Sequence, residues 1–510
     1  MAGEVTAVEE ALRRRRRWTW PFGLVLALAT LIGLVALIAA LWVWVVTSRE
    51  TTPRFADAEE HFLFGSIGSE PESGLPAALW RALPHLMPEE FDDRGDWSAL
   101  GFLYADGRDL PIGVSTRRVN GVDLAWLNCA VCHTGTWREA PDDAPQIVSA
   151  MPSNNLDFYR FISTLMEVAV DERLAPEPVF AAMRAAGDRP GPIDRLVWRH
   201  IVLPEVREGL LRTRARIQPL LDYQPEWGPG RVDTFNPYKL LHGGWTLDDM
   251  APEERIGTAD FPAVFLQRPR EGMQLHWDGN NPSLAERNLS AALGAGVTAE
   301  TVDHAAIGRV ADWLMDLEPP PSPHTPDPDL VAEGRDIYMR ACADCHGHQG
   351  ADGYVFEGAY LGTVEPIHEI GTSPWRLDSY TEAFNAYQRE YLFAGTPHAF
   401  RAFTVTDGYA NLPLDGLWLR APYLHNGAVP TLADLLEPPE ARPAAFLRGL
   451  DVIDRDRGGF VAPLCDPAEP PDEGFCFDTR QPGNGNEGHL YGTDLPADAK
   501  AALLAYLLTF

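Results

Sequence analysis

The chain is poor in positive charge, and above all in lysine. Its 510 residues contain 42 lysines and arginines against 73 aspartates and glutamates, which gives a formal net charge of -31. The lysines are Lys239 and Lys500. A surface this acidic repels nucleic acid and favours basic or neutral partners, so we expect no nucleic-acid partner. Keeping the protein in solution is the simpler role for the acidity.

Cysteine is also scarce, with six residues. Four of them form two motifs, each a pair of cysteines three apart followed by a histidine. The motifs are Cys129, Cys132 and His133, and Cys342, Cys345 and His346. In this pattern two thiols bind the vinyl groups of one haem, and the adjoining imidazole binds the iron. For one motif a chance match, a zinc site or a redox pair is the alternative, and a second match weakens it. The sequence therefore predicts two covalently bound haem c groups.

The last two cysteines, Cys465 and Cys476, lie in a segment rich in Pro, Asp and Gly. Disulfides persist in oxidising compartments, where haem attachment of this kind also takes place. We expect a disulfide between them, which closes a short loop and contributes about 3 kcal/mol at most. Two free thiols are the alternative.

Charge is lacking between Trp20 and Val46, directly after five arginines at 13–17. A secretory signal has about 7–15 apolar residues, whereas about 20 span a bilayer, so this longer segment predicts a membrane helix. The arginines place the N-terminus in the cytoplasm. We expect a single-pass protein of the inner membrane that contacts membrane lipid through this helix, with periplasmic haem domains. A cleaved signal is the alternative. The predicted parts are a basic N-terminus at 1–17, an anchor at 18–47 and a polar linker at 48–60.

Strand signals are sparse in the remainder. Apolar spacing suits helices at 155–170 and 178–186, whereas turn residues and aromatics dominate 219–265. The expected fold class is mainly α with long irregular loops: two cytochrome c-like haem domains plus an N-terminal transmembrane helix. Six prolines between Pro319 and Pro328 predict a stiff linker. The predicted boundaries are an N-terminal haem c domain at 61–318, the linker at 319–329 and a C-terminal haem c domain at 330–510.

Each predicted haem domain ends in a similar amphipathic helix. One covers 309–317 and the other 499–510, with Trp313 corresponding to Tyr506. A further helix at 331–338 leads into Cys342, as the first helix of a cytochrome c domain does. We interpret this as a weak internal repeat in which first and last helices pack beside the haem. Two similar helices by chance are the alternative.

Methionine is absent after Met339, which lies too close to Cys342 to reach the far face of the haem. The sixth ligand of the second haem is therefore a histidine or is absent. This ligand decides whether the iron is closed for electron transfer or open to oxygen and peroxide. We favour His425, because Pro422 and Gly427 bound a rigid loop around it; a histidine bonded to a propionate is the alternative. The histidines considered are His348, which is too near the motif, His368, His398, His425 and His489.

No spacing selects a distal ligand for the first haem. His276 and Trp277 place an imidazole beside a large aromatic, ahead of a helix that starts near Ser283. From the residues alone, a satisfied loop histidine beside a core tryptophan is the first interpretation. The open candidates are Met151, Met166, Met183, Met250, Met273, His200, His242 and His276.

These motifs together resemble the di-haem cytochrome c peroxidase superfamily, and most closely its rubber-oxygenase-like branch. The resemblance rests on both haem motifs and on residues 420–432 and 484–495. It implies a mostly helical protein with a low-spin C-terminal haem, for which it carries His425 over as the distal ligand. It also implies that oxygen or peroxide reacts at the N-terminal haem, with His276 and Trp277 lining its distal pocket. The polyisoprene-cleaving members have a phenylalanine-lined pocket, whereas this chain offers His276 and a small pair, Ala291 and Ala292.

We therefore expect a membrane-anchored, exported di-haem c-type cytochrome that acts as a peroxidase- or oxygenase-like oxidoreductase. Its partners would be a small oxidant such as peroxide or oxygen and a redox partner protein. His276, with a pKa near neutrality, would move a proton during catalysis, and Trp277 would pass an electron from the second haem. The alternative is a non-catalytic di-haem electron-transfer cytochrome.

Overall fold

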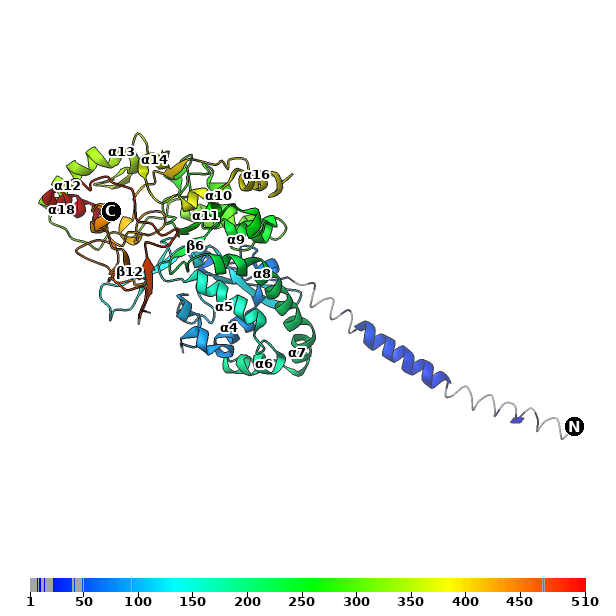
Figure 1. Cartoon of the computed structure of the whole chain (residues 1–510). Coiled ribbons are helices and arrows are strands. Elements are labelled where there is room, and N and C mark those ends of the chain that lie inside the picture. Colours follow the sequence, from blue (N-terminus) through cyan, green and yellow to red (C-terminus); the bar gives the residue numbers. More distant parts are fainter. Residues whose placement is uncertain are drawn as a thin grey trace. The chain divides into compact units, whose positions relative to one another are not determined.

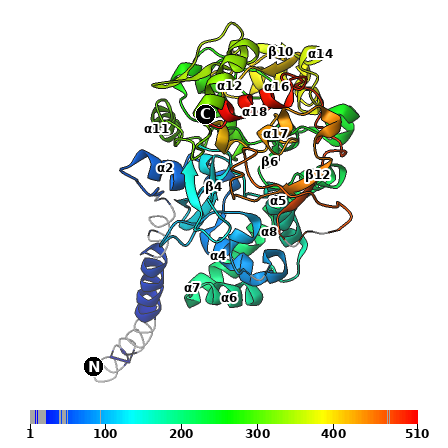
Figure 2. The same cartoon turned by 90° about the vertical axis from the view of Figure 1, so that its left-hand side faces the viewer.

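A computed structural model gives the arrangement of the chain (Figures 1 and 2). The chain divides into two compact units, residues 1–52 with 117–123, and residues 53–116 with 124–510. Both haem motifs lie in the second unit. The described residues are 7, 9, 10, 13, 22–38, 41, 48, 50–92, 94–469, 471 and 473–510.

The structure contradicts the predicted membrane anchor. No helix among the described residues is both long and apolar enough to cross a bilayer. Apart from residues 22–38 and Leu41, the predicted anchor at 18–47 lies outside the described residues. The predicted localisation, a single-pass inner-membrane protein with periplasmic haem domains, is corrected on the same finding.

The fold-class prediction of a mainly α protein with a transmembrane helix is also wrong. The chain contains 43% helix and 12% strand. Among the described residues the strands form five two-stranded antiparallel sheets and one three-stranded sheet of order β1-β3-β2, so their alternation is too brief to stand out in the sequence. Paired are β1 (Leu75–Pro76) with β3 (Val122–Leu127), β4 (Thr134–Trp137) with β5 (Gln146–Ser149), β6 (Arg231–Asp233) with β7 (Thr258–Asp260), β8 (His348–Gly350) with β9 (Gly353–Val355), β10 (Val364–Pro366) with β11 (Gly408–Ala410), and β12 (Ala445–Arg448) with β13 (Phe475–Asp478); β2 spans Val114–Val119.

Side-chain caps define the start of several helices. Asp157 accepts a hydrogen bond from the amide of Arg160 (2.9 Å), and Ser283 accepts one from Glu286 (3.3 Å). Helices α4 to α8 lie together in both views (Figures 1 and 2). The helices are α2 (Ala58–Phe64), α3 (Glu70–Ser73), α4 (Ala77–Leu86), α5 (Phe158–Val170), α6 (Pro176–Ala185), α7 (Pro192–Val197), α8 (Leu203–Tyr223), α9 (Asn236–Tyr238), α10 (Leu284–Gly294), α11 (His304–Leu314), α12 (Pro328–Ala341), α13 (Ala343–His346), α14 (Ile367–Ile370), α15 (Trp375–Asp378), α16 (Glu382–Tyr391), α17 (Leu432–Leu435) and α18 (Ala497–Leu507).

Helices α12 and α18 pack closely, as the sequence predicts for the first and last helices of a haem domain (Figures 1 and 2). The approach requires Gly334, because a Cβ there would lie 1.9 Å from the carbonyl oxygen of Ala502. Tyr338 then meets Tyr506, with ring centroids 5.2 Å apart. This contact positions the end of α12, directly before Cys342.

A matching contact stands before the first motif. Trp313 of α11 meets Phe62 of α2, with ring centroids 5.2 Å apart. Trp313 is the residue that the sequence aligns with Tyr506. The two aromatic pairs therefore agree with the predicted internal repeat.

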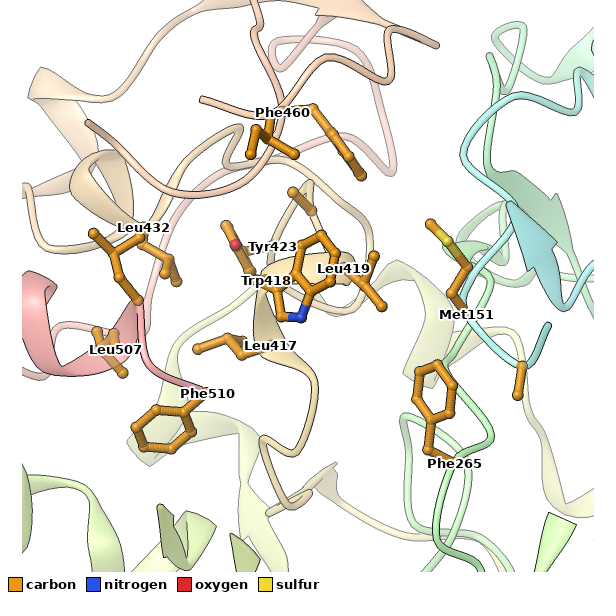
Figure 3. Packing of buried hydrophobic residues seen from close by; sticks show 14 of the residues in the cluster. Met151, Phe265, Leu417, Trp418, Leu419, Tyr423, Leu432, Phe460, Leu507 and Phe510 are labelled. Atoms are coloured by element: carbon orange, nitrogen blue, oxygen red, sulfur yellow. The ribbon is translucent and has the colours of Figure 1, made fainter. Parts of the chain in front are cut away.

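The main hydrophobic core draws on both predicted haem domains. Figure 3 shows Trp418 and Leu419 between Met151 and Phe265 on one side and Phe510 on the other. The domain boundaries stay predictions, but the segments on either side of residue 319 share one core.

The predicted disulfide between Cys465 and Cys476 is present. It ties β13 to the preceding loop. Next to it, β12 and β13 bring Phe446 opposite Phe477, and both side chains are buried.

Candidate functional site

The second haem motif begins where α12 ends. Cys342 precedes α13, and neither it nor Cys345 forms a disulfide. The Nδ1 atom of His346 donates a 2.8 Å hydrogen bond to the carbonyl oxygen of Leu412. This bond fixes the ring so that Nε2 is left as the iron ligand. Burial lowers the pKa of His346, and the nearby Arg420 lowers it too, so the ring is neutral as a ligand must be.

His489 faces His346. Their ring centroids lie 6.3 Å apart. With metal–nitrogen bonds of about 2 Å, two histidines that bind one metal ion from opposite sides place their ring centres roughly 6 Å apart. Burial lowers the pKa of His489 to about 4, and its buried Nδ1 has no hydrogen-bond partner. The pair therefore fits a haem iron held from both faces.

The loop that carries His489 is held by its backbone. Its amide donates to the carbonyl of Ile370 (2.8 Å), and Arg442 donates to the carbonyls of Gly488 (3.0 Å) and His489 (3.3 Å). His489 has a φ of 48°, in the left-handed region. A residue with a side chain adopts this conformation at an energetic cost, and such residues concentrate at functional sites.

His425, the predicted distal ligand, lies elsewhere. It is buried and stacks on Tyr409, with ring centroids 4.0 Å apart and an angle of 18° between the rings. Its carbonyl accepts a 2.9 Å hydrogen bond from the amide of Asp260. Among the described residues it makes no ring contact with His346. The structure therefore brings His489 to the ring of His346 and His425 to the ring of Tyr409, and His425 as a ligand stays a prediction.

The remaining histidines considered for the second haem do not face His346. His368 is exposed beside Glu369. His398 is exposed and stacks on His304, with ring centroids 3.6 Å apart. His348 lies in β8, and its buried Nδ1 has no hydrogen-bond partner.

The first motif sits on a short helical turn, Cys129–Val131. The side chain of Asn128 caps this turn by accepting a 2.9 Å hydrogen bond from the amide of Ala130. The Nδ1 atom of His133 donates to the carbonyl oxygen of Pro262 (2.9 Å). Burial lowers the pKa of His133 to about 4. As at His346, Nε2 is left to bind iron.

His276 and Trp277 occupy a rigid turn. Nδ1 of His276 donates to Oδ1 of Asn280 (2.7 Å), and the indole Nε1 of Trp277 donates to the carbonyl of Asp260 (2.8 Å). His276 also has a left-handed backbone, with a φ of 63°. Burial lowers its pKa to about 4, against the raising effects of Asp278 and Asn280. The imidazole is therefore neutral near pH 7. Its pKa lies well below the near-neutral value expected from the sequence.

An arginine that the sequence did not single out lies near the first motif. Burial lowers the pKa of Arg287 to about 10, the charge of Arg270 lowers it further, and Cys129 opposes the shift. Arg287 projects from α10, the helix predicted to start near Ser283. It brings a positive charge to Cys129 and His133 of the first motif.

Phenylalanines gather at the first motif. A buried apolar cluster, here called the phenylalanine cluster, packs against Cys129 and includes Ala292. The ring of Phe403 lies 6.1 Å from that of His276, at an angle of 23°. Sequence analysis missed this lining because most of it follows the second motif by tens of residues. The phenylalanines are Phe235, Phe384, Phe393, Phe400 and Phe403.

A continuous path of bonds joins the two proximal histidines. From His133 it passes through Pro262 to Asp260, whose carbonyl accepts from Trp277. The carbonyl of Trp277 accepts from the amide of Ala410 (2.8 Å). Two residues further on, Leu412 accepts from His346.

Both motifs fit a covalently bound haem. Each offers two thiols outside any disulfide and a neutral imidazole that is fixed through Nδ1. Each also has apolar neighbours, because Cys129 and Cys342 pack against the buried core. The residues present therefore satisfy the requirements of haem attachment.

Comparison with known proteins agrees with this chemistry. Over 551 aligned positions the chain is 25% identical to uncharacterized protein y4iJ of Sinorhizobium fredii (strain NBRC 101917 / NGR234), which covers 85% of this chain and 87% of that protein. Uncharacterized protein y4iM of the same organism is 28% identical over 251 residues, 45% of this chain and 56% of that protein. Residues 408–447 match the family described as RoxA-like, cytochrome c-like. This cytochrome c-like domain links the chain to the RoxA-like haem cytochromes.

Proposed function

We propose that the protein is a di-haem c-type cytochrome with oxidoreductase activity. The haem at Cys129 and Cys132 is the reaction centre for a small oxidant, and the haem at Cys342 and Cys345 is an electron-transfer centre. The bound haems supply one-electron redox chemistry and, where an axial position is open, a site for oxygen or peroxide.

The observation that carries this proposal is the path of hydrogen bonds and short backbone segments between His133 and His346. Trp277 stands in its middle and is held at both ends, through its indole nitrogen and its carbonyl. An indole is oxidisable, so Trp277 suits the passage of electrons between the two centres.

The second motif suits electron transfer. His489 faces His346 on a loop fixed by Arg442. His346 and His489 would therefore hold the iron of the second haem, in place of His346 and His425, and with both imidazoles bound that iron would serve electron transfer and not reaction with an oxidant.

The first motif suits reaction with an oxidant. In the part of the chain that the structure describes, His133 has no ring contact of the kind that joins His346 to His489. Arg287 acts electrostatically on both His133 and His276, which puts His276 near the first motif. Nδ1 of His276 donates to Asn280, which leaves its Nε2 to accept a proton. A base with a pKa of about 4 returns that proton readily, which suits the transfer of a proton from one oxygen of peroxide to the other.

With hydrogen peroxide as the oxidant, two electrons and two protons convert one peroxide to two waters, and the oxygen–oxygen bond is cleaved. The proposed electron source is a redox partner protein with a basic or neutral surface, since the chain carries a net charge of -31. An oxygenase reaction on an organic substrate is the other form of the proposal, and the phenylalanine cluster offers an apolar wall for it.

A spectrum of the purified protein tests the proposal. We expect two haems per chain, one low-spin and one high-spin in the ferric state, with cyanide or carbon monoxide bound by one of them. Two low-spin haems that bind neither ligand would instead support a non-catalytic electron carrier. A haem content of one per chain would contradict both.

A further inference from the structure

A buried arginine, Arg270, and a partly buried one, Arg420, share one carboxylate close to the second motif. Oδ1 of Asp415 accepts hydrogen bonds from Arg420 (3.0 Å) and from Arg270. The exposed side-chain fractions are 1% for Asp415, 7% for Arg270 and 16% for Arg420. Oδ2 of Asp415 and Nε of Arg420 are buried without partners. Two cations and one anion leave this triad with one net positive charge away from water.

The triad is built into the segment that holds His346. Nη1 of Arg420 donates to the carbonyl of Pro413 (2.8 Å), the residue after Leu412, whose carbonyl accepts from His346. The next amide, of Leu414, donates to the hydroxyl of Tyr354 (2.8 Å), and this hydroxyl donates to the carbonyl of His346. The triad and the proximal histidine are thus linked at consecutive residues.

Arg270 is held as firmly as Arg420. Its Nη1 donates to the carbonyls of Phe265 (2.9 Å) and Leu266 (2.8 Å), and its guanidinium carbon lies 5.3 Å from the ring centre of Phe356. A guanidinium bound in this way cannot swing out to solvent when the charge nearby changes. Its charge acts on Tyr354 and Arg420 beside the second motif and stays in place.

We propose that Arg270, Asp415 and Arg420 raise the reduction potential of the haem attached at Cys342 and Cys345. A buried positive charge opposes the extra positive charge of ferric iron more than it opposes ferrous iron, and a low dielectric strengthens the effect. The triad favours the reduced state and so makes this centre an electron acceptor from the partner. This inference rests on the proposed second haem.

The test is an optical redox titration of the purified protein with its haems attached. Arg270→Gln removes a cation and shifts the equilibrium of the second haem about tenfold toward the oxidised state, a potential about 59 mV lower. Asp415→Asn removes the anion and shifts the potential upward. Arg270→Lys keeps the charge and stays near the wild-type potential. Arg268→Gln is the matched control, because Arg268 lies two residues away but is exposed and paired with Asp316.

The opposite signs separate an electrostatic role from a structural one. If Arg270→Gln and Asp415→Asn shift the potential in the same direction, or Arg270→Lys shifts it as far as Arg270→Gln, the inference is wrong. Arg420→Gln is the second variant if Arg270→Gln does not accumulate, and the same lower potential is expected. Mass spectrometry first determines how many haems are attached to each protein. A wild-type protein without a haem at Cys342 contradicts the proposed function. Variants that carry two haems and keep the wild-type potential contradict this inference alone.

Discussion

The two haem motifs are alike on the side of the cysteines and different on the other side. At each, Nδ1 of the motif histidine donates to a backbone carbonyl, of Pro262 or of Leu412. Across from His346 stands the ring of His489, whereas the first motif has the phenylalanine cluster and Arg287 nearby. The same five-residue motif therefore serves two environments. On the proposed function, the segments that approach from elsewhere in the chain distinguish the proposed electron-transfer centre from the proposed reaction centre.

Those segments come largely from one part of the chain. His489 follows the second motif, and so do Phe384, Phe393, Phe400 and Phe403, which belong to the lining of the first. The second half of the chain thus completes both sites. This explains why the core of Figure 3 joins residues from both sides of the proline-rich stretch.

The largest expected effect is on the spin state of the second haem. His489→Ala should convert that haem from low to high spin, because the second imidazole is lost. His425→Ala should leave it low-spin, since His425 stacks on Tyr409 instead of facing His346. EPR of both ferric variants gives the answer. A conversion in His425→Ala and none in His489→Ala would restore the assignment made from the resemblance.

The next effect concerns turnover at the first haem. His276→Ala should slow peroxide turnover by about 10²–10⁴-fold, the usual contribution of a positioned acid–base group. The spin state of the first haem should not change. His304→Ala is the control, since His304 is exposed at the start of α11. A new high-spin signal in His276→Ala would make His276 an axial ligand, and wild-type turnover would remove it from the site.

A smaller effect should follow from breaking the path between the two motifs. Trp277→Phe removes the hydrogen bond to Asp260 and replaces the indole with a ring that is harder to oxidise. We expect electron transfer between the haems to slow about tenfold or more, equivalent to about 1.4 kcal/mol in the barrier. Stopped-flow reduction followed at both haem bands measures it. Trp245→Phe is the control, since Trp245 contacts Phe384 and Tyr387 away from the path.

The sequence was sufficient for features with a local signature. The helices at 309–317 and 331–338, the one near Ser283 and the disulfide all follow from spacing or composition that neighbouring residues carry. It was insufficient for α8, whose polar, arginine-rich sequence shows little apolar periodicity and runs through Pro219. The prediction of a membrane anchor was wrong because composition gives the length of an apolar segment, whereas the length of the helix that the described residues form cannot be taken from composition.

The distal ligand of the second haem stays a prediction, and the structure brings a different histidine, His489, to the ring of His346. His425 lies in a rigid loop, and a rigid loop is a reasonable place for a ligand, but rigidity does not reveal which way the loop faces. His489 carried no stronger signal than four other histidines, because its approach to His346 depends on Arg442 and on the close passage of Gly488 by the backbone of Gly371, which leaves no room for a Cβ. Such long-range contacts are invisible in a single sequence. The phenylalanine cluster was missed on the same ground.

The smallest expected effect is on stability at low pH, and it bears on what lies between the two motifs. Burial lowers the pKa of His425 to about 3, with Arg376 and Arg231 adding to the shift. Because the unfolded chain binds this proton near pH 6.5, the neutral ring contributes stability above that pH, and the contribution is lost as the pH falls toward 3. One such group contributes about 1.4 kcal/mol per pH unit to the slope. His425→Gln should therefore flatten the pH dependence of the thermal midpoint between pH 6.5 and 4, with the haems attached.

His368→Gln, at a histidine whose side chain is 73% exposed, should leave the curve unchanged. Parallel curves for wild type and His425→Gln would mean that the proton is bound elsewhere. A loss of the low-spin signal in His425→Gln would instead show that it binds iron, and the two motifs would then differ less than their surroundings indicate.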